Sequence, residues 1–121
     1  MDVRELRLGN YVDNNVEIFK LEAKDLIFLL AFDNEHYANP IPLTEEWLLK
    51  FGFEKEIDCG SEYWTIQIGN NLHLTISLED NTAGIDLNWK SQGSLIWMMV
   101  KHIHTLQNVY YSLTGEELEV K

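Results

Sequence analysis

The sequence predicts an α+β fold: an antiparallel β-meander with an N-terminal hairpin, one short helix (about 44–52) and one longer C-terminal helix (about 101–114). Three observations lead to this prediction. Apolar and polar residues alternate with period two after position 60. A complete set of helix start and stop signals precedes that region, and a 3.6-residue period follows it. A run of strands with helices segregated to either side is typical of α+β proteins.

The length and composition indicate one folded domain. The chain has 121 residues, of which 45% are hydrophobic and 12% aromatic. This content is enough to fill a hydrophobic core and argues against intrinsic disorder. We therefore treat residues 1–121 as a single domain.

The first third of the chain predicts a hairpin followed by an ambiguous segment. Residues 8–12 and 16–21 are typical of short strands, and residues 13–15 of the turn between them. Residues 23–32 are less clear. Asp25 is suited to cap a helix, while the apolar run after it is equally typical of a buried strand. Both readings stay open.

The short helix has signals at both ends. Thr44 is a natural N-cap, because its hydroxyl accepts from an amide of the first turn. Glu45 and Glu46 place negative charge at the positive end of the helix dipole. Gly52 favours the left-handed conformation that ends a helix, and Phe53 is expected to fold back on the last turn. One face carries Trp47, Leu48 and Phe51.

Three runs of alternating residues predict the meander: residues 63–68, 72–78 and 85–90. The polar stretches 69–71 and 80–84 are expected to be the turns. Residues 95–100 fit either a fourth strand or the first turns of the last helix.

The last helix has an apolar face and a polar face. Ile103, Leu106, Tyr110 and Leu113 recur at helical spacing, and Gly115 ends the helix. On the opposite side lie four side chains that form a candidate interaction surface: His104, Gln107, Asn108 and Tyr111. Glu45 and Glu46 of the short helix belong to the same candidate set. The competing interpretation is an ordinary solvated helix face.

The sequence predicts no metal ion and no cofactor. His102 and His104 could share a metal on extended backbone, with Cys59 and His73 as further ligands. On a helix, however, residues two apart point about 200° away from each other, and no second pair at ligand spacing occurs. No glycine-rich phosphate loop or nucleophile motif is present either.

One enzymatic pattern is present in part. Asp80, Asp86 and Lys90 resemble the carboxylates and lysine of metal-dependent nucleases, which converge on a divalent ion at the scissile phosphate. Asn88 stands where that pattern has an acidic residue. An exposed strand explains the same spacing, so we expect no catalytic residues.

Charge and cysteine content limit the partners and the location. The net charge is −11, which argues against direct nucleic-acid binding and against anionic membranes. The single cysteine fits a reducing compartment. The charged N-terminus lacks the apolar core of a signal peptide, and no apolar run is long enough to cross a bilayer. We expect a cytoplasmic protein.

Three blocks, at residues 8–12, 40–53 and 102–118, together carry a family resemblance. They begin Leu-Gly-Asn-Tyr-Val, Pro-Ile-Pro-Leu-Thr-Glu-Glu-Trp and His-Ile-His-Thr-Leu-Gln-Asn-Val-Tyr-Tyr. The chain resembles a family of small uncharacterised proteins of bacteriophages, prophages and mobile elements of Bacteroides-like bacteria. The resemblance implies a phage or prophage origin in a bacterial cell and brings no catalytic residues with it.

The functional prediction is a non-enzymatic phage or prophage accessory protein that acts by protein–protein binding. In one version it is an acidic inhibitor that occupies a nucleic-acid-binding surface of a host factor. One alternative is a metal-dependent, phosphate-directed enzyme such as a nuclease. Another is a virion or assembly component. The sequence leaves the partner and the oligomeric state open.

Overall fold

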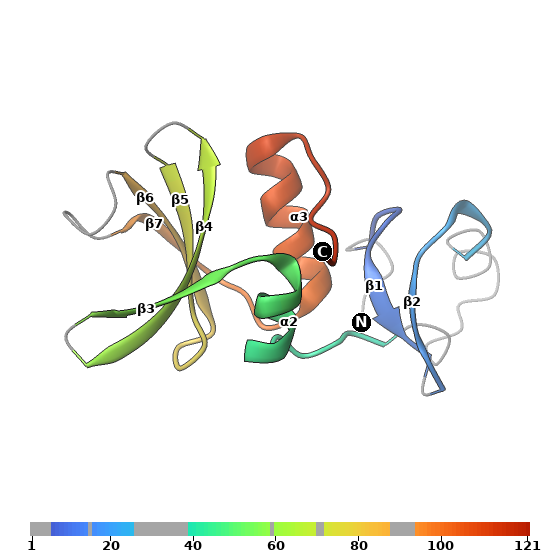
Figure 1. Cartoon of the computed structure of the whole chain (residues 1–121). Helices are drawn as coiled ribbons and strands as arrows, with labels where there is room; N and C mark the ends of the chain where they lie inside the picture. Colours follow the sequence, from blue (N-terminus) through green and yellow to red (C-terminus); the bar gives the residue numbers. More distant parts are fainter. Residues whose placement is uncertain (1–5, 15, 26–38, 59, 70–71, 88–93) are drawn as a thin grey trace.

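Two antiparallel sheets and two helices make up the described fold (Figure 1). The computed structural model describes residues 6–14, 16–25, 39–58, 60–69, 72–87 and 94–121. The hairpin consists of β1 (Tyr11–Asp13) and β2 (Ile18–Lys20), and the helices are α2 (Glu45–Phe51) and α3 (Ile103–Thr114). The main sheet follows chain order: β3 (Glu54–Asp58), β4 (Ser61–Gly69), β5 (Leu72–Ser77), β6 (Thr82–Leu87) and β7 (Ser94–Met99). The predicted α+β class is confirmed.

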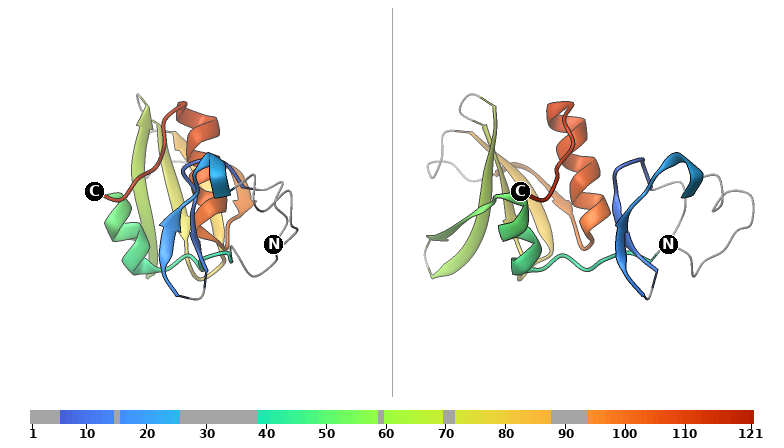
Figure 2. Two further views of the ribbon diagram at one scale, coloured as in Figure 1. Left: turned by 90° about the vertical axis from the view of Figure 1, so that its right-hand side faces the viewer. Right: turned by 45° about the vertical axis from the view of Figure 1, so that its right-hand side comes forward.

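The elements form layers. Both helices lie on one face of the five-stranded sheet, and α3 lies between that sheet and the β1–β2 hairpin (Figures 1 and 2). After α3 the C-terminal segment runs back toward α2, where the Lys121 amide donates to the Lys50 carbonyl at 2.8 Å. The helices are thus covered on both sides. The main core lies between helices and sheet and contains Leu48, Phe51, Phe53, Trp64, Leu74, Ile76, Ala83, Val100, Ile103, Leu106 and Leu118.

The period-two pattern fixes which face of the sheet meets the helices. Trp64, Ile76 and Ala83 lie opposite one another across β4, β5 and β6, and all three are buried. Thr65 and Thr75 form the neighbouring pair in the same register. Because side chains alternate along a strand, these threonines belong to the face away from the helices.

The short helix has the predicted caps. The Thr44 hydroxyl accepts from the Trp47 amide at 3.4 Å. Gly52 has φ 94°, and its amide donates to the Leu49 carbonyl at 3.1 Å. The Phe53 amide donates to the Leu48 carbonyl at 3.0 Å, which completes a Schellman motif. Phe53 is buried beneath it.

Some element boundaries differ from the prediction. Residues 95–100 belong mainly to strand β7, and β6 begins at Thr82, inside the predicted turn. β1 begins only at Tyr11, because Gly9 turns the chain with φ 88°. Residues 23–25 are helical, and the rest of the ambiguous segment lies outside the described residues.

Strand β3 was not predicted. Its sequence, Glu-Lys-Glu-Ile-Asp, has too few apolar residues to show a buried face. It is an edge strand, where charged side chains discourage pairing with other chains. Its Lys55 ammonium lies 5.8 Å from the centre of the Trp64 ring, so the aliphatic part of the lysine covers the edge of the core.

Replacing Gly52 by alanine should destabilise the protein. A residue with a Cβ in the left-handed conformation costs about 1–2 kcal/mol, and the new Cβ would also lie 3.2 Å from Cε of Lys121. The measurement is the free energy of unfolding in urea. Leu49→Ala, at an exposed position of the same helix, should change it by less than about 0.5 kcal/mol. Equal losses in both variants would contradict the role assigned to Gly52.

Candidate functional site

Helix α3 begins one residue after His102, which changes the geometry of the two histidines. His102 is the N-cap with φ −127° and ψ 155°, so it is extended while His104 is helical. The two rings are therefore stacked, with centres 5.7 Å apart and planes inclined by 11°. The expectation that they point in opposite directions assumed that both are helical, and it is wrong.

The predicted polar face of α3 is largely internal. The exposed fractions of His104 and Gln107 are 1% and 0%. Asn108 is half-buried and Tyr111 is exposed. The reason is the layer order, because the hairpin and the C-terminal segment cover the side of α3 that faces away from the sheet. Of the four residues, a partner therefore has direct access chiefly to Tyr111 and Asn108.

Gln107 joins three segments through one buried carboxamide. Its Oε1 accepts from the Tyr11 amide at 2.8 Å. Its Nε2 donates to the carbonyls of Gly9 and Leu118, both at 3.1 Å. Without Gln107, the Tyr11 amide and the carbonyls of Gly9 and Leu118 would lose this hydrogen-bond partner. A buried backbone group without a partner lowers the free energy of unfolding.

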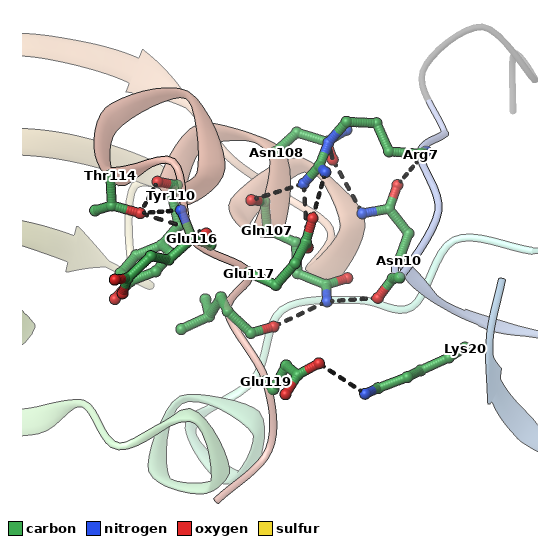
Figure 3. A network of polar contacts seen from close by, with 12 residues as sticks. Arg7, Asn10, Lys20, Gln107, Asn108, Tyr110, Thr114, Glu116, Glu117 and Glu119 are labelled. Carbon is green, nitrogen blue, oxygen red and sulfur yellow. Dashed lines mark hydrogen bonds and ion pairs between the residues drawn. The ribbon is translucent and has the colours of Figure 1, made fainter. Parts of the chain in front are cut away.

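Arg7 extends this network toward the surface (Figure 3). Its Nε donates to Asn108 Oδ1 at 2.8 Å, and its Nη1 lies 2.6 Å from Glu117 Oε1. Asn10 Nδ2 donates to the same Asn108 oxygen at 2.9 Å. The guanidinium also lies 4.2 Å from the centre of the Tyr111 ring. Asn108 and Tyr111 are thus positioned by Arg7.

A second ion pair connects the hairpin with the C-terminal segment. Lys20 Nζ lies 3.0 Å from Glu119 Oε1 and 5.6 Å from the centre of the Tyr11 ring. The hydrogen bond to Glu119 raises the pKa of Lys20 above its usual 10.5. Both side chains are well exposed, so this pair contributes little to stability.

A surface hollow of about 800 Å³ lies along α3, next to the Arg7 network. It is lined by Arg7, Met98, His104, Thr105, Asn108, Val109, Tyr111, Ser112 and Leu113. Of the four predicted α3 residues, Asn108 and Tyr111 therefore contribute accessible surface to the hollow, and His104 lines it with almost no exposed area. Arg7 and Met98, at opposite ends of the chain, were not predicted, and no local pattern indicates them.

The hollow differs in character from the rest of this acidic protein. Among the described residues that line it, none is Asp, Glu or Lys. Its charged group, Arg7, is neutralised by Glu117. Leu113 and Tyr111 are 39% and 42% exposed, so apolar surface is accessible there.

The C-terminal end of α3 borders the hollow and is negative. The last turn of the helix carries no basic residue, and the exposed Glu116 follows the glycine cap. Burial, together with the nearby Glu116 carboxylate, raises the pKa of Tyr110 above its usual 10.0.

The two acidic candidates on α2 are exposed but paired. Glu46 Oε1 lies 3.4 Å from Lys50 Nζ, one turn along the helix. Glu45 Oε1 lies 3.8 Å from Lys55 Nζ. Neither residue lines the hollow. The structure therefore does not bring Glu45 and Glu46 together with the α3 candidates.

The structure brings no nuclease-like set together in its described part. Asn88, Lys90 and Cys59 lie outside the described residues, as does the side chain of Asp86. Asp80 lies in the turn before β6 and accepts from the Ser77 hydroxyl at 3.4 Å. From Thr82 to Asp86 the strand extends about 13 Å, so the two aspartates are on well-separated backbone positions.

Searches for related proteins and for metal or membrane features gave no assignment. No protein-family model, curated protein or solved structure matches the chain. Within the described ranges, no three His, Cys, Asp or Glu side chains are grouped so that they could hold a metal ion. Nor does that part contain a helix long and apolar enough to cross a membrane.

Gln107→Met should destabilise the protein by about 2 kcal/mol or more. Methionine has a similar volume but leaves the Tyr11 amide and two carbonyls without their partner, and each such loss costs about 1–3 kcal/mol. Urea unfolding measures the stability, and hydrogen exchange of the Tyr11 amide should become faster. Ser112→Ala, on the exposed side of the same helix, is the control. An unchanged exchange rate of the Tyr11 amide would contradict the role of Gln107 in joining the three segments.

Tyr110→Phe should make stability less sensitive to alkaline pH. The folded state holds the pKa of Tyr110 above 10.0, so the unfolded chain ionises first. The neutral tyrosine therefore stabilises the fold fully below pH 10.0, and this contribution is lost as pH rises through the raised pKa. Urea unfolding at pH values on either side of 10.0 measures the effect. The alkaline loss should persist in Tyr111→Phe, and an undiminished loss in Tyr110→Phe would contradict the assignment.

Proposed function

We propose that this protein acts by binding another protein and that the hollow beside α3 is its contact surface. The observation that carries the proposal is the composition of that hollow. The chain has a net charge of −11, yet the described lining contains Met98, Tyr111, Leu113 and a neutralised Arg7, with no acidic residue or lysine.

This composition is typical of the centres of protein interfaces. The centres of interfaces are depleted in Lys, Glu and Asp and enriched in aromatic residues, Met and Arg. Accessible apolar surface bordered by polar groups is a common mark of a binding site. The hollow also has a preorganised frame, because Asn108 accepts from Arg7 and Asn10, and Arg7 also donates to the Gln107 carbonyl. A preorganised surface loses less conformational entropy on binding.

The biological setting is part of the proposal. The resemblance of residues 8–12, 40–53 and 102–118 to proteins of phages and mobile elements supports an accessory role in a bacterial cell. The strong negative charge supports a version in which the protein inhibits a basic host factor by covering its nucleic-acid-binding surface.

Leu113→Ser should weaken the interaction. A central anchor belongs to the minority of interface residues whose truncation costs more than about 1 kcal/mol, which corresponds to about a five- to tenfold loss of affinity. The protein and the variant are immobilised separately and exposed to extract of the organism that encodes the protein. Quantitative mass spectrometry then compares what each retains.

Val16→Ser is the matched control. Val16 is 90% exposed in the β1–β2 turn and does not line the hollow. We expect at least one protein that the unmodified chain and Val16→Ser retain equally and that Leu113→Ser loses. If the three immobilised proteins retain the same set at every salt concentration, the hollow is not the contact surface.

A further inference from the structure

We infer that the hollow takes a basic segment of the partner, with an apolar side chain in the hollow and a Lys or Arg at the C-terminal end of α3. This inference rests on the proposed function and adds to it the chemistry of the partner. Two features of α3 carry it: its negative end has no cation of its own, and the apolar hollow reaches into the same helical turn.

The end of α3 leaves negative charge unbalanced. Helix C-termini carry a partial negative charge from carbonyls that lack an intrahelical partner. The Gly115 amide donates to the Tyr111 carbonyl and the Thr114 hydroxyl to the Tyr110 carbonyl, both at 2.8 Å. Both donors are neutral. The last turn contains no basic residue to offset the dipole.

Helix α2 provides the contrast within the same protein. Its last turn contains Lys50, whose ammonium also pairs with Glu46 at 3.4 Å. Lys121 lies next to its glycine cap, with Cε 3.2 Å from the position of a Cβ on Gly52. The last turn of α2 therefore contains a cation, whereas that of α3 does not. Arg7 reaches α3 one turn earlier, where its Nη2 donates to the Gln107 carbonyl at 3.3 Å, and its charge is paired with Glu117.

Glu116 adds a full negative charge at this point. Its side chain is exposed and forms no ion pair with any residue that the structure describes. The next carboxylate, Glu117, is engaged with Arg7 at 2.6 Å. Glu116 and the end of the helix dipole thus present an accessible site for a cation from outside the chain, which is favourable at a helix C-terminus.

The apolar and the acidic parts are adjacent. Ser112 and Leu113 line the hollow and belong to the last turn of α3, directly before the glycine cap and Glu116. One helical turn is about 5.4 Å long, so neighbouring side chains of one partner segment reach both parts. Because side chains alternate along an extended segment, a partner that carries an apolar and a basic residue two positions apart presents both to this surface. A segment with acidic residues is repelled.

Three synthetic peptides of equal length test the inference. The first repeats Leu-Leu-Lys-Lys (the Leu/Lys peptide), the second Leu-Leu-Glu-Glu (Leu/Glu) and the third Ser-Ser-Lys-Lys (Ser/Lys), so that each face of an extended peptide carries both residue types. Each is titrated into isotopically labelled protein, and amide NMR shifts report where it binds. We expect the Leu/Lys peptide to shift the amides of Leu113, Gly115 and Glu116, and the other two to have much weaker effects.

Glu116→Gln separates local charge from net charge. An exposed ion pair contributes little, so the variant should bind the Leu/Lys peptide about two- to fivefold more weakly. Glu54→Gln makes the same change in net charge on edge strand β3, where Glu54 pairs with Thr65 on the face of the sheet away from the helices. Its affinity for the peptide should remain unchanged.

Each other outcome has a distinct meaning. Equal binding of the Leu/Glu peptide at α3 would overturn the basic partner and leave the proposed protein-binding hollow intact. Equal binding of the Ser/Lys peptide would overturn the apolar anchor. If no peptide shifts the α3 amides, both the inference and the proposed contact surface fail. Concentration-dependent shifts of the same amides in the free protein would assign the hollow to a second copy of this chain instead.

Discussion

The buried carboxamide of Gln107 is the interaction on which the arrangement of the layers depends. It satisfies backbone groups of Gly9, Tyr11 and Leu118, which lie on the two segments that cover α3. Buried backbone groups need partners, and an apolar residue at this position would leave them unpaired. The hydrogen bonds of Gln107 therefore act together with apolar packing, since Leu118 lies in the core and the Tyr11 ring contacts Trp47 and Phe51.

This constraint divides α3 into three strips with different tasks. Ile103 and Leu106 pack in the core. His104 and Gln107 face the interior on the polar side. The remaining strip contains Thr105, Val109, Ser112 and Leu113 and lines the hollow. Its spacing of four, three and one residues follows one side of a helix. The surface left for a partner is thus set by what the two intramolecular contacts do not use.

The sequence predicted what local chemistry determines. Thr44 and Gly52 mark the ends of α2 by capping alone, and alternation identifies β4 and β5. The prediction failed where contacts between segments distant in the sequence determine burial or strand pairing. A helix face rich in His, Gln and Asn looks solvated unless a second layer covers it, and nothing near Gln107 indicates that Gly9 and Tyr11, nearly a hundred positions earlier, supply that layer. Strand β3 is held by pairing with β4, which its charged sequence does not show.

The ion pairs explain how a protein of this charge can present both an acidic surface and a helix, α3, whose last turn contains no basic residue. Arg7, Lys20, Lys50 and Lys55 each lie within ion-pair distance of a carboxylate of this chain. Few cations therefore remain to neutralise the other carboxylates, and the long-range field stays negative. Such a field accelerates the approach of a basic partner but does not hold it, because exposed charges are screened by salt. Retention needs apolar burial. Among the described residues, the hollow provides apolar surface next to the negative end of α3, so one site combines electrostatic attraction with apolar burial.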